Sequence, residues 1–502
     1  MKRYILAIDQ STSGTKALIL DEEGNVAVKT GRGHRQKISA EGWVSHDPVE
    51  IYRNTIAAAA DALARAGTDP SEVVCAAVSN QRETALVWDR KTGVPVDDAV
   101  VWQCSRGEEI CGRIRDKAAF IQEKTGLPLS PYFSASKIAW LLEHTGSLHN
   151  KNLCAGTVDS WLVYKLAGNF KTDWSNASRT QLLNLRTLAW DRDVCGLFGI
   201  DPAILPEISD SNACFGSTDF EGLLPRPVPL QCVMGDSHAS LFGQGCLEKG
   251  MGKVTYGTGS SVMVNTGEQP VFCENLSASI AWGMNGRISY VLEGNVNYSG
   301  AVIKWLADDV KLLSSAAEAG PLAASANPED TTYLVPAFSG MGAPYWAAGA
   351  KAAFWGMTRK TGRAELVKAA EECIAYQIAD VIRTIREEGI TLRELRIDGG
   401  GCGDHYLLQF QSDILNLPVF VSTAGELSGM GAAYAAGLAA GIYGQDIFSR
   451  RSSKSYEPEM DGERRKALYG GWLEAVRAVT GAETGRAWHA GERGAEGKRP
   501  RA

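Results

Sequence analysis

Asp9 ends an apolar run that begins at residue 4, and a turn of small residues, Ser11 to Thr15, follows. Small side chains let backbone N–H groups approach phosphate oxygens, while a carboxylate at a strand end can hold a hydrated Mg²⁺. Lys16 adds positive charge. This pattern suits the phosphates and metal of a magnesium nucleotide. It is also typical of an ordinary β-hairpin, because a second apolar run and the turn of residues 21–25 follow.

The strand, turn and strand pattern recurs in the middle of the chain. Residues 253–268 again contain an apolar run, a turn of Gly, Thr and Ser, and a second apolar run. Two such loops on duplicated domains can hold one nucleotide between them. A third segment, residues 397–415, places a run of glycines before apolar residues at helical spacing. Glycines allow a flat adenine or sugar ring to reach the backbone, although a helix packed closely on a strand gives the same pattern.

Three further segments carry side chains that suit a hydroxylated substrate. Arg82 and Glu83 follow a predicted strand, and an adjacent donor and acceptor can bind neighbouring hydroxyl groups. Trp102 can pack against a carbon skeleton. Asp236, at another strand end, can accept the proton of an attacking hydroxyl group. The respective alternatives are a surface ion pair, a core tryptophan and a helix N-cap.

The composition suits a globular protein of two domains. The chain has 502 residues, of which 44% are hydrophobic and 22% charged. A formal net charge of −7 argues against nucleic acid or an anionic membrane as the main partner. The first apolar run is too short for a signal peptide and no later run could span a bilayer, so we expect no membrane insertion and a cytoplasmic location. The eleven cysteines lack metal-binding spacing, which predicts reduced thiols.

The order of the predicted elements indicates an α/β fold with mixed sheets. Residues 428–441 are so rich in glycine and alanine that they predict a helix packed very closely on a neighbour. The polar segment after Gly481 predicts a disordered tail. The main helices are expected at residues 49–64, 137–144 and 371–388, and the strands around residues 4–20, 72–89, 230–235, 253–265, 288–293 and 395–398.

In their order along the chain, these segments resemble the FGGY family of carbohydrate kinases, and within it the glycerol kinases. The likeness extends from about residue 2 to residue 444, which makes it far more specific than any single motif. Residues 132–144 fit the first family signature, and residues 352–372 fit the second except at Glu371, where an apolar residue is usual. The matching motifs include IDQSTSGTK, NQRETALVW, VVWQC, PYFSASKIAWLLEH, YGTG, LEGNV, VPAFSGMGAPYW and IDGGGCGDHYLLQFQSDIL.

The resemblance implies two actin-like, RNase H-like domains with the active site in the cleft between them. It implies ATP and Mg²⁺ as cofactors and phosphorylation of a primary hydroxyl group of a small polyol or sugar, with glycerol as the first candidate. We expect a substrate-binding domain at residues 1–248, an ATP-binding domain at residues 249–482, a disordered tail at residues 483–502, and assembly into a homodimer or homotetramer. The alternatives from other classes are a non-catalytic actin-like ATP-binding protein and a hydrolase of the same superfamily.

The resemblance also implies roles for individual residues. Asp236 takes the role of general base, and Asp9 that of the carboxylate that organises magnesium. The positions that match substrate-binding residues are Arg82, Glu83, Trp102, Tyr132 and Asp236. The positions that match nucleotide-binding residues are Thr12, Ser13, Lys16, Thr258, Gly259, Gly300, Lys304, Gly400 and Asp404.

Two substrate-site positions depart from the glycerol kinase pattern. Ser237 stands where glutamine is typical, and Ser261 stands where phenylalanine usually covers the carbons of the substrate. The loss of a bulky wall and a long amide predicts a larger, wetter pocket, and each lost contact is worth about 1–3 kcal/mol in discrimination. A larger polyol or a ketose, such as erythritol, xylulose or ribulose, is therefore the alternative substrate. Asp404, where asparagine is usual, bears on nucleotide affinity.

Overall fold

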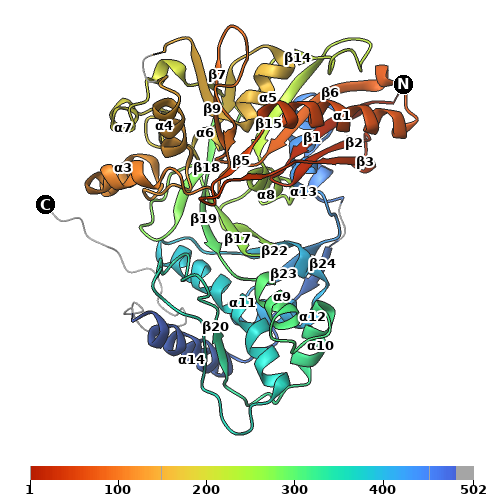
Figure 1. The fold of residues 1–502 in the computed structure, drawn as a ribbon. Helices are drawn as coiled ribbons and strands as arrows, with labels where there is room; N and C mark the ends of the chain where they lie inside the picture. The colour runs from red at the N-terminus through yellow and green to blue at the C-terminus, as the bar shows by residue number, and fades with distance from the viewer. Residues whose placement is uncertain (1, 148–149, 451–452, 482–502) are drawn as a thin grey trace, which may run out of the picture.

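Two mixed sheets form the centre of the molecule, one above the other in Figure 1. The computed structural model describes residues 2–147, 150–450 and 453–481, so the tail predicted at residues 483–502 lies outside the described residues. The first sheet has the strand order β14-β15-β6-β1-β2-β3. Its strands are β1 (Tyr4–Gln10), β2 (Gly14–Leu20), β3 (Val26–Gly33), β6 (Val73–Asn80), β14 (Ser217–Thr218) and β15 (Val228–Gly235).

Strand β1 is buried along its whole length because it is covered on both edges and both faces. It pairs antiparallel with β2 and parallel with β6. Leu6 and Ile8 belong to the hydrophobic cluster that includes helix α1 (Pro48–Ala66), whereas Ile5 and Ala7 belong to the cluster that includes helix α13 (Leu427–Ala439). The continuous apolar run before Asp9 follows from this burial on two faces.

The second sheet repeats the arrangement of the first, as the sequence predicts. Strand β16 forms an antiparallel hairpin with β17 and lies parallel to β22, in the same way as β1 pairs with β2 and β6. The strand order is β18-β19-β17-β16-β22-β23-β24. The strands are β16 (Met251–Tyr256), β17 (Ser260–Gly267), β18 (Ser277–Met284), β19 (Arg287–Val296), β22 (Glu394–Gly399), β23 (Val419–Ser422) and β24 (Ser453–Tyr456).

Helices α8 (Asp236–Gly243) and α13 join the two halves of the chain. Although α13 comes from the second half, it packs against β1 and β6 of the first sheet (Figure 1). A Cβ atom on Gly431 would lie 1.8 Å from the carbonyl oxygen of Ala239 in α8, so only glycine fits there. The prediction of a closely packed helix at residues 428–441 is thus confirmed.

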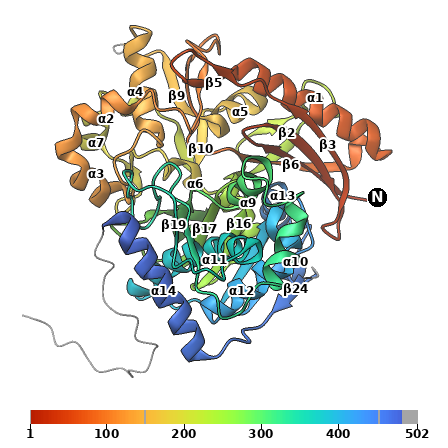
Figure 2. The same ribbon diagram turned by 60° about the horizontal axis from the view of Figure 1, so that its bottom comes forward.

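The helices of the second half gather beside the second sheet, as Figure 2 shows. Helix α14 (Gly462–Thr480) is held on α11 (Arg363–Glu387) by Asp380, which accepts hydrogen bonds from the Tyr469 hydroxyl at 2.6 Å and the Trp472 indole at 2.8 Å. Burial raises the pKa of Asp380 to about 6. The helices beside the second sheet also include α9 (Gly300–Asp308), α10 (Ala319–Ala324) and α12 (His405–Leu415).

A third sheet lies beside the first and is reached through residues 81–84, which connect β6 to β7. Helix α4 (Ser134–His144) packs on it, and helix α5 (Val158–Ala167) contacts both this sheet and the first. Within the described part of the chain, no helix is long and apolar enough to cross a membrane. All eleven cysteines are free. The order of strands in the third sheet is β4 (Lys37–Ile38), β5 (Val44–His46), β8 (Ala99–Val100), β7 (Ala85–Asp89) and β9 (Leu153–Thr157).

Candidate active site

Two cavities lie against the turn of residues 399–404, between β22 and α12. The larger has a volume of about 880 Å³ and the smaller about 470 Å³. Gly400 and Asp404 line the larger cavity, whereas Gly399 and Cys402 line the smaller one. The two cavities therefore share this turn as part of their walls.

The smaller cavity collects charged side chains from both halves of the chain. Asp9 comes from β1 and Asp236 from the start of α8, whereas Asp398 comes from β22. Sequence reasoning selected Asp9, Lys16 and Asp236 but missed Asp398, although both Asp9 and Asp398 follow an isoleucine at the end of a predicted strand. The charged groups that line this cavity are Asp9, Lys16, Asp236, Lys253, Asp398 and Glu426.

Asp9 and Asp398 occupy corresponding edges of the two sheets. Asp9 is opposite Ser79 in the parallel register and accepts a 2.6 Å hydrogen bond from its hydroxyl group. Asp398 is opposite Thr255 and accepts hydrogen bonds through Oδ2 from Ser240 and Gln244.

Asp9 and Asp398 differ in the hydrogen bonds that their carboxyl groups accept. Burial raises the pKa of Asp9 to about 6, against the opposing effects of the Ser79 hydrogen bond and the charge of Lys16. The Oδ1 atom of Asp398 is buried and has no hydrogen-bond partner within the described residues. Such an unsatisfied buried oxygen calls for a ligand, an ion or water.

Asp236 is the partly exposed end of a network of ion pairs that is otherwise buried. Its side chain is 32% exposed, and its Oδ1 lies 3.4 Å from Nε of Arg82 and accepts a hydrogen bond from the backbone of Ser237. The two terminal nitrogens of Arg82 donate to the carboxylate of Glu293 at 2.9 and 2.8 Å. This two-point contact fixes the plane of the guanidinium group, so that Nε faces Asp236.

Glu293 and Arg179 complete the network, and sequence reasoning missed both. Arg179 donates to Glu83 at 2.6 Å and lies 2.9 Å from Glu293. Burial opposes ionisation of Glu293, but Arg179 and Arg82 outweigh it and hold the pKa of Glu293 well below its usual value. The hydroxyl group of Ser261 also donates to Glu293, at 3.0 Å. The LEGNV motif contains Glu293, but nothing local in it indicates a partner so far away in sequence.

Tyr132 and Trp102 pack together at the edge of this network. Their ring centroids are 5.5 Å apart in an edge-to-face arrangement. The indole N–H of Trp102 donates to the hydroxyl of Thr12 at 2.9 Å, which links the predicted substrate wall to the predicted phosphate turn. Burial raises the pKa of Tyr132, and the charge of Glu83 adds to the shift. The Tyr132 hydroxyl therefore remains a hydrogen-bond donor across the ordinary pH range.

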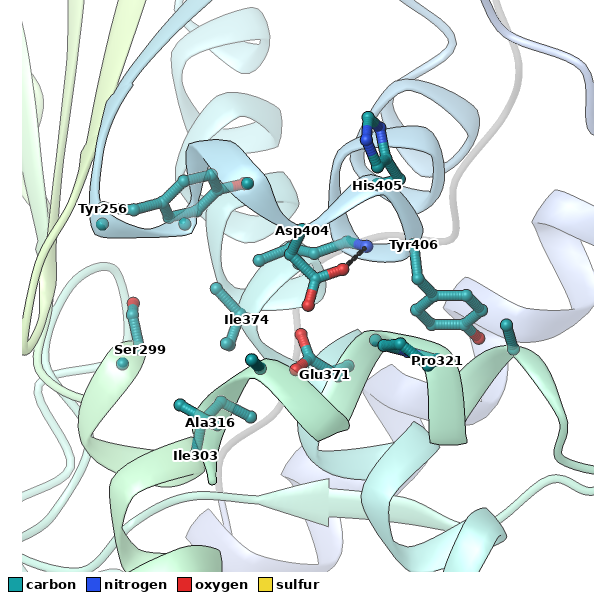
Figure 3. A pocket seen from close by; sticks show the side chains of 18 of the residues that line it. Tyr256, Ser299, Ile303, Ala316, Pro321, Glu371, Ile374, Asp404, His405 and Tyr406 are labelled. Atoms are coloured by element: carbon teal, nitrogen blue, oxygen red, sulfur yellow. Dashed lines mark hydrogen bonds between the residues drawn. The ribbon is translucent and has the colours of Figure 1, made fainter. Parts of the chain in front are cut away.

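The larger cavity lies between α9, α10, α11 and the turn before α12 (Figure 3), and its surface is mostly apolar. Gly300, Gly400 and Asp404, three of the predicted nucleotide positions, line it. Asp404 caps α12, because its Oδ1 accepts the backbone N–H of Leu407 at 3.0 Å. Glu371, which departs from the family signature, also lines this cavity.

The remaining predicted nucleotide positions lie around these cavities. Ser13 is exposed in the turn between β1 and β2. Lys16 pairs with Glu426 at 2.7 Å, which outweighs partial burial and raises the pKa of Lys16. The carbonyl of Thr258 accepts hydrogen bonds from the first turn of α9, and Gly259 adjoins it. Lys304 is 79% exposed and pairs with Asp308 at 2.7 Å.

Models of known protein families match most of the chain. The model described as "FGGY family of carbohydrate kinases, N-terminal domain" matches residues 4–243, and the corresponding C-terminal model matches residues 252–440. The chain belongs to the FGGY family of carbohydrate kinases. The predicted family and the α/β fold of two actin-like domains are thereby confirmed.

Individual relatives place this FGGY kinase among proteins similar to glycerol kinase. It is 45% identical over 490 residues to glycerol kinase 1 of Thermotoga maritima, covering 95% of this chain and 99% of the relative. It is 42% identical to the glycerol kinase of Thermococcus onnurineus, over 96% and 99% of the two chains. The crystal structure of Plasmodium falciparum glycerol kinase with ADP superposes with a TM-score of 0.90 at 34% identity, over 95% of this chain and 98% of that one.

Proposed function

We propose that this protein transfers the γ-phosphoryl group of ATP to a primary hydroxyl group of a small polyol, with glycerol as the first candidate. The observation that carries the proposal is the position of Asp236. It is an accessible carboxylate at the mouth of the Arg82–Glu293 network, in the same cavity as Asp9, Lys16 and Asp398. The names of the relatives, which are glycerol kinases, support glycerol as the substrate.

In this proposal Asp236 accepts the proton of the attacking hydroxyl group. The hydroxyl oxygen forms a new bond to the γ-phosphorus as the bond from that phosphorus to the bridging oxygen breaks, which leaves ADP. Arg82 fixes the orientation of the base through its Nε, and each terminal nitrogen of Arg82 keeps a second N–H for a substrate hydroxyl group. Tyr132 and Trp102 supply a donor and an apolar wall for the polyol.

We propose that the nucleotide extends across both cavities, with its base in the larger and its phosphates in the smaller. The mostly apolar surface of the larger cavity suits a planar ring, and the two lysines of the smaller cavity suit phosphates. Thr12, Ser13, Thr258 and Gly259 are proposed to contact the phosphates through the two turns. Lys304 would have to leave its partner Asp308 to take part.

The donor set of the smaller cavity fits Mg²⁺. Magnesium usually takes one or two carboxylates together with phosphate oxygens and several waters. Asp9 and Asp398 line this cavity, and Oδ1 of Asp398 is buried without a partner within the described residues. When bound there, Mg²⁺ would neutralise charge that develops on the phosphates during transfer.

A larger polyol or a ketose remains the alternative substrate, and Ser237 and Ser261 favour it. Ser237 lines the smaller cavity beside Asp236. Ser261 donates a hydrogen bond to Glu293, which also binds Arg82. Both side chains are shorter than the glutamine and phenylalanine that are usual at these positions in glycerol kinases. A four- or five-carbon chain is the occupant that would use this room.

Further properties of the protein are proposed with the function. We propose a division into a substrate domain at residues 1–248 and an ATP domain at residues 249–482, which agrees with the two family matches at residues 4–243 and 252–440. We also propose a cytoplasmic location, which rests on the short first apolar run and the expected reduced thiols, and assembly into two or four copies, which rests on the resemblance to glycerol kinases.

The deciding experiment measures release of ADP from ATP with a panel of glycerol, erythritol, xylulose and ribulose. We expect release only when a polyol or ketose is added, with phosphate appearing on that compound. Release of ADP without any added polyol would favour a hydrolase of the same superfamily. Nucleotide binding without turnover on any compound would favour a non-catalytic actin-like protein.

A further inference from the structure

The larger cavity contains a carboxyl group that the described protein leaves without a partner. Glu371 lies on α11 and lines the cavity, yet it is only 2% exposed. Within the described residues its side chain takes part in no hydrogen bond or ion pair, unlike its neighbour Glu372, which accepts a 2.7 Å hydrogen bond from the Tyr406 hydroxyl. Its carboxyl group is therefore available to a ligand that enters this cavity.

Asp404 presents a second carboxyl group to the same space. Figure 3 shows the side chains of Glu371 and Asp404 pointing toward one another across the cavity. A Cβ atom on Gly320 would lie 2.5 Å from Oδ1 of Asp404, so α10 closes the cavity against this carboxyl group. Burial, followed by the charge of Asp404, raises the pKa of Glu371 well above its usual value. Burial and the nearby charge thus favour the protonated form of Glu371, which has one O–H donor and one carbonyl acceptor.

We propose that Glu371 and Asp404 recognise the base of the nucleotide through an exocyclic amino group flanked by ring nitrogens, and so select adenine over 6-oxopurines. This inference rests on the function proposed above, because it assumes that the base of the phosphate donor occupies the larger cavity. It assigns to Glu371 a role in specificity.

The hydrogen-bonding pattern of adenine matches this pair. Oδ1 of Asp404 caps α12, so the second carboxyl oxygen can accept a hydrogen bond from the 6-amino group. The neutral Glu371 can donate its O–H to an adjacent ring nitrogen. In hypoxanthine and guanine an oxygen replaces the amino group at this position and would face the carboxylate, lone pair against lone pair. A site whose buried polar groups are left unpaired rejects such an analogue strongly.

The test compares ATP, ITP and GTP as phosphate donors and measures the binding of ADP and IDP by calorimetry. For the unaltered protein we expect kcat/KM for ATP to exceed that for ITP by at least about 100-fold. Glu371→Leu should reduce this ratio at least about tenfold, with the loss in KM and in ADP affinity and little change in kcat, because the base lies far from the reacting phosphate. Glu371→Gln keeps one donor and one acceptor and should preserve the ratio.

Glu387→Leu serves as the matched control, because it makes the same change on the same helix at a side chain that is 59% exposed. It should leave the ATP to ITP ratio unchanged. Equal use of ATP and ITP by the unaltered protein, preference for GTP, or an unchanged ratio in Glu371→Leu would each overturn the inference. None of these results would overturn the proposed kinase reaction, which fails only if no nucleotide supports transfer to any polyol.

Discussion

Replacement of Glu293 by glutamine tests whether the buried ionic network positions the catalytic base. The carboxylate of Glu293 is fully buried, binds both terminal nitrogens of Arg82, and pairs with Arg179. Glutamine has nearly the same shape but offers one acceptor in place of two. Glu293→Gln should therefore release one edge of Arg82 and place an N–H donor of glutamine against a guanidinium donor.

The magnitude follows from the charges in the network. Arg82 and Arg179 carry two positive charges, which Glu83 and Glu293 balance, and the four side chains are between 0% and 6% exposed. The substitution leaves one positive charge unbalanced in a buried site. Removal of one partner from a buried pair typically costs about 3–5 kcal/mol of folding free energy. Misplacement of Asp236 by about 1 Å through Arg82 should lower kcat about 100-fold.

The assay combines the unfolding midpoint in denaturant with steady-state turnover of ATP and polyol. Ser261→Ala is the matched control, because it removes only the neutral 3.0 Å hydrogen bond to Glu293 and should cost about 1 kcal/mol. We expect a large fall in both midpoint and kcat for Glu293→Gln and a small fall in midpoint for Ser261→Ala. If Glu293→Gln unfolds at the midpoint of the unaltered protein and keeps its kcat, the network does not position the base.

Three other changes test the remaining assignments. Asp236→Asn should lower kcat about 10²–10⁴-fold while ADP affinity measured by calorimetry stays the same, and near-normal turnover would exclude Asp236 as the base. The double change Ser237→Gln with Ser261→Phe should shift preference toward glycerol by about tenfold or more in kcat/KM; if the unaltered protein already prefers glycerol to every larger polyol, the enlarged pocket is wrong. Asp380→Asn tests the pH dependence of stability. The pKa of Asp380 is raised from 3.8 to about 6 in the folded state, so between these two pH values the folded protein binds a proton that the unfolded protein has lost. The free energy of unfolding of the unaltered protein, relative to that of the variant, should therefore fall by up to about 3 kcal/mol as the pH rises from 3.8 to 6. Parallel stability curves for Asp380→Asn and the unaltered protein between pH 4 and 7 would contradict this reasoning.

The sequence predicts those features that depend on neighbouring residues. The apolar run before Asp9, the turn after it, and the repeat of this pattern at residues 253–268 depend on strand alternation and turn composition, and both hairpins form as expected. The glycine run before α12 and the close-packed helix at residues 428–441 likewise follow from local composition, since a helix rich in glycine and alanine can approach its neighbour closely.

Contacts between distant segments required the tertiary structure. Glu293 lies 211 positions after Arg82, and Glu426 lies 410 positions after Lys16, so no local spacing links either pair. Asp398 belongs to the IDGGGCG motif, but the sequence alone does not indicate that it lines the smaller cavity. That position results from the parallel pairing of β22 with β16. Lys304 shows the converse, because its match to the family motif does not indicate that its side chain lies exposed beside Asp308.

The sequence by itself determined the α/β class, the duplicated hairpins and the identity of the general-base candidate, because these depend on periodicity and on residue type at strand ends. Only the tertiary structure decided which charges neutralise one another and which remain free for a ligand. The physical reason is that burial and partner geometry set the state of an ionisable group. Glu371 and Glu372 are identical neighbours in sequence, yet Glu372 accepts a hydrogen bond from Tyr406 whereas Glu371 lines the larger cavity.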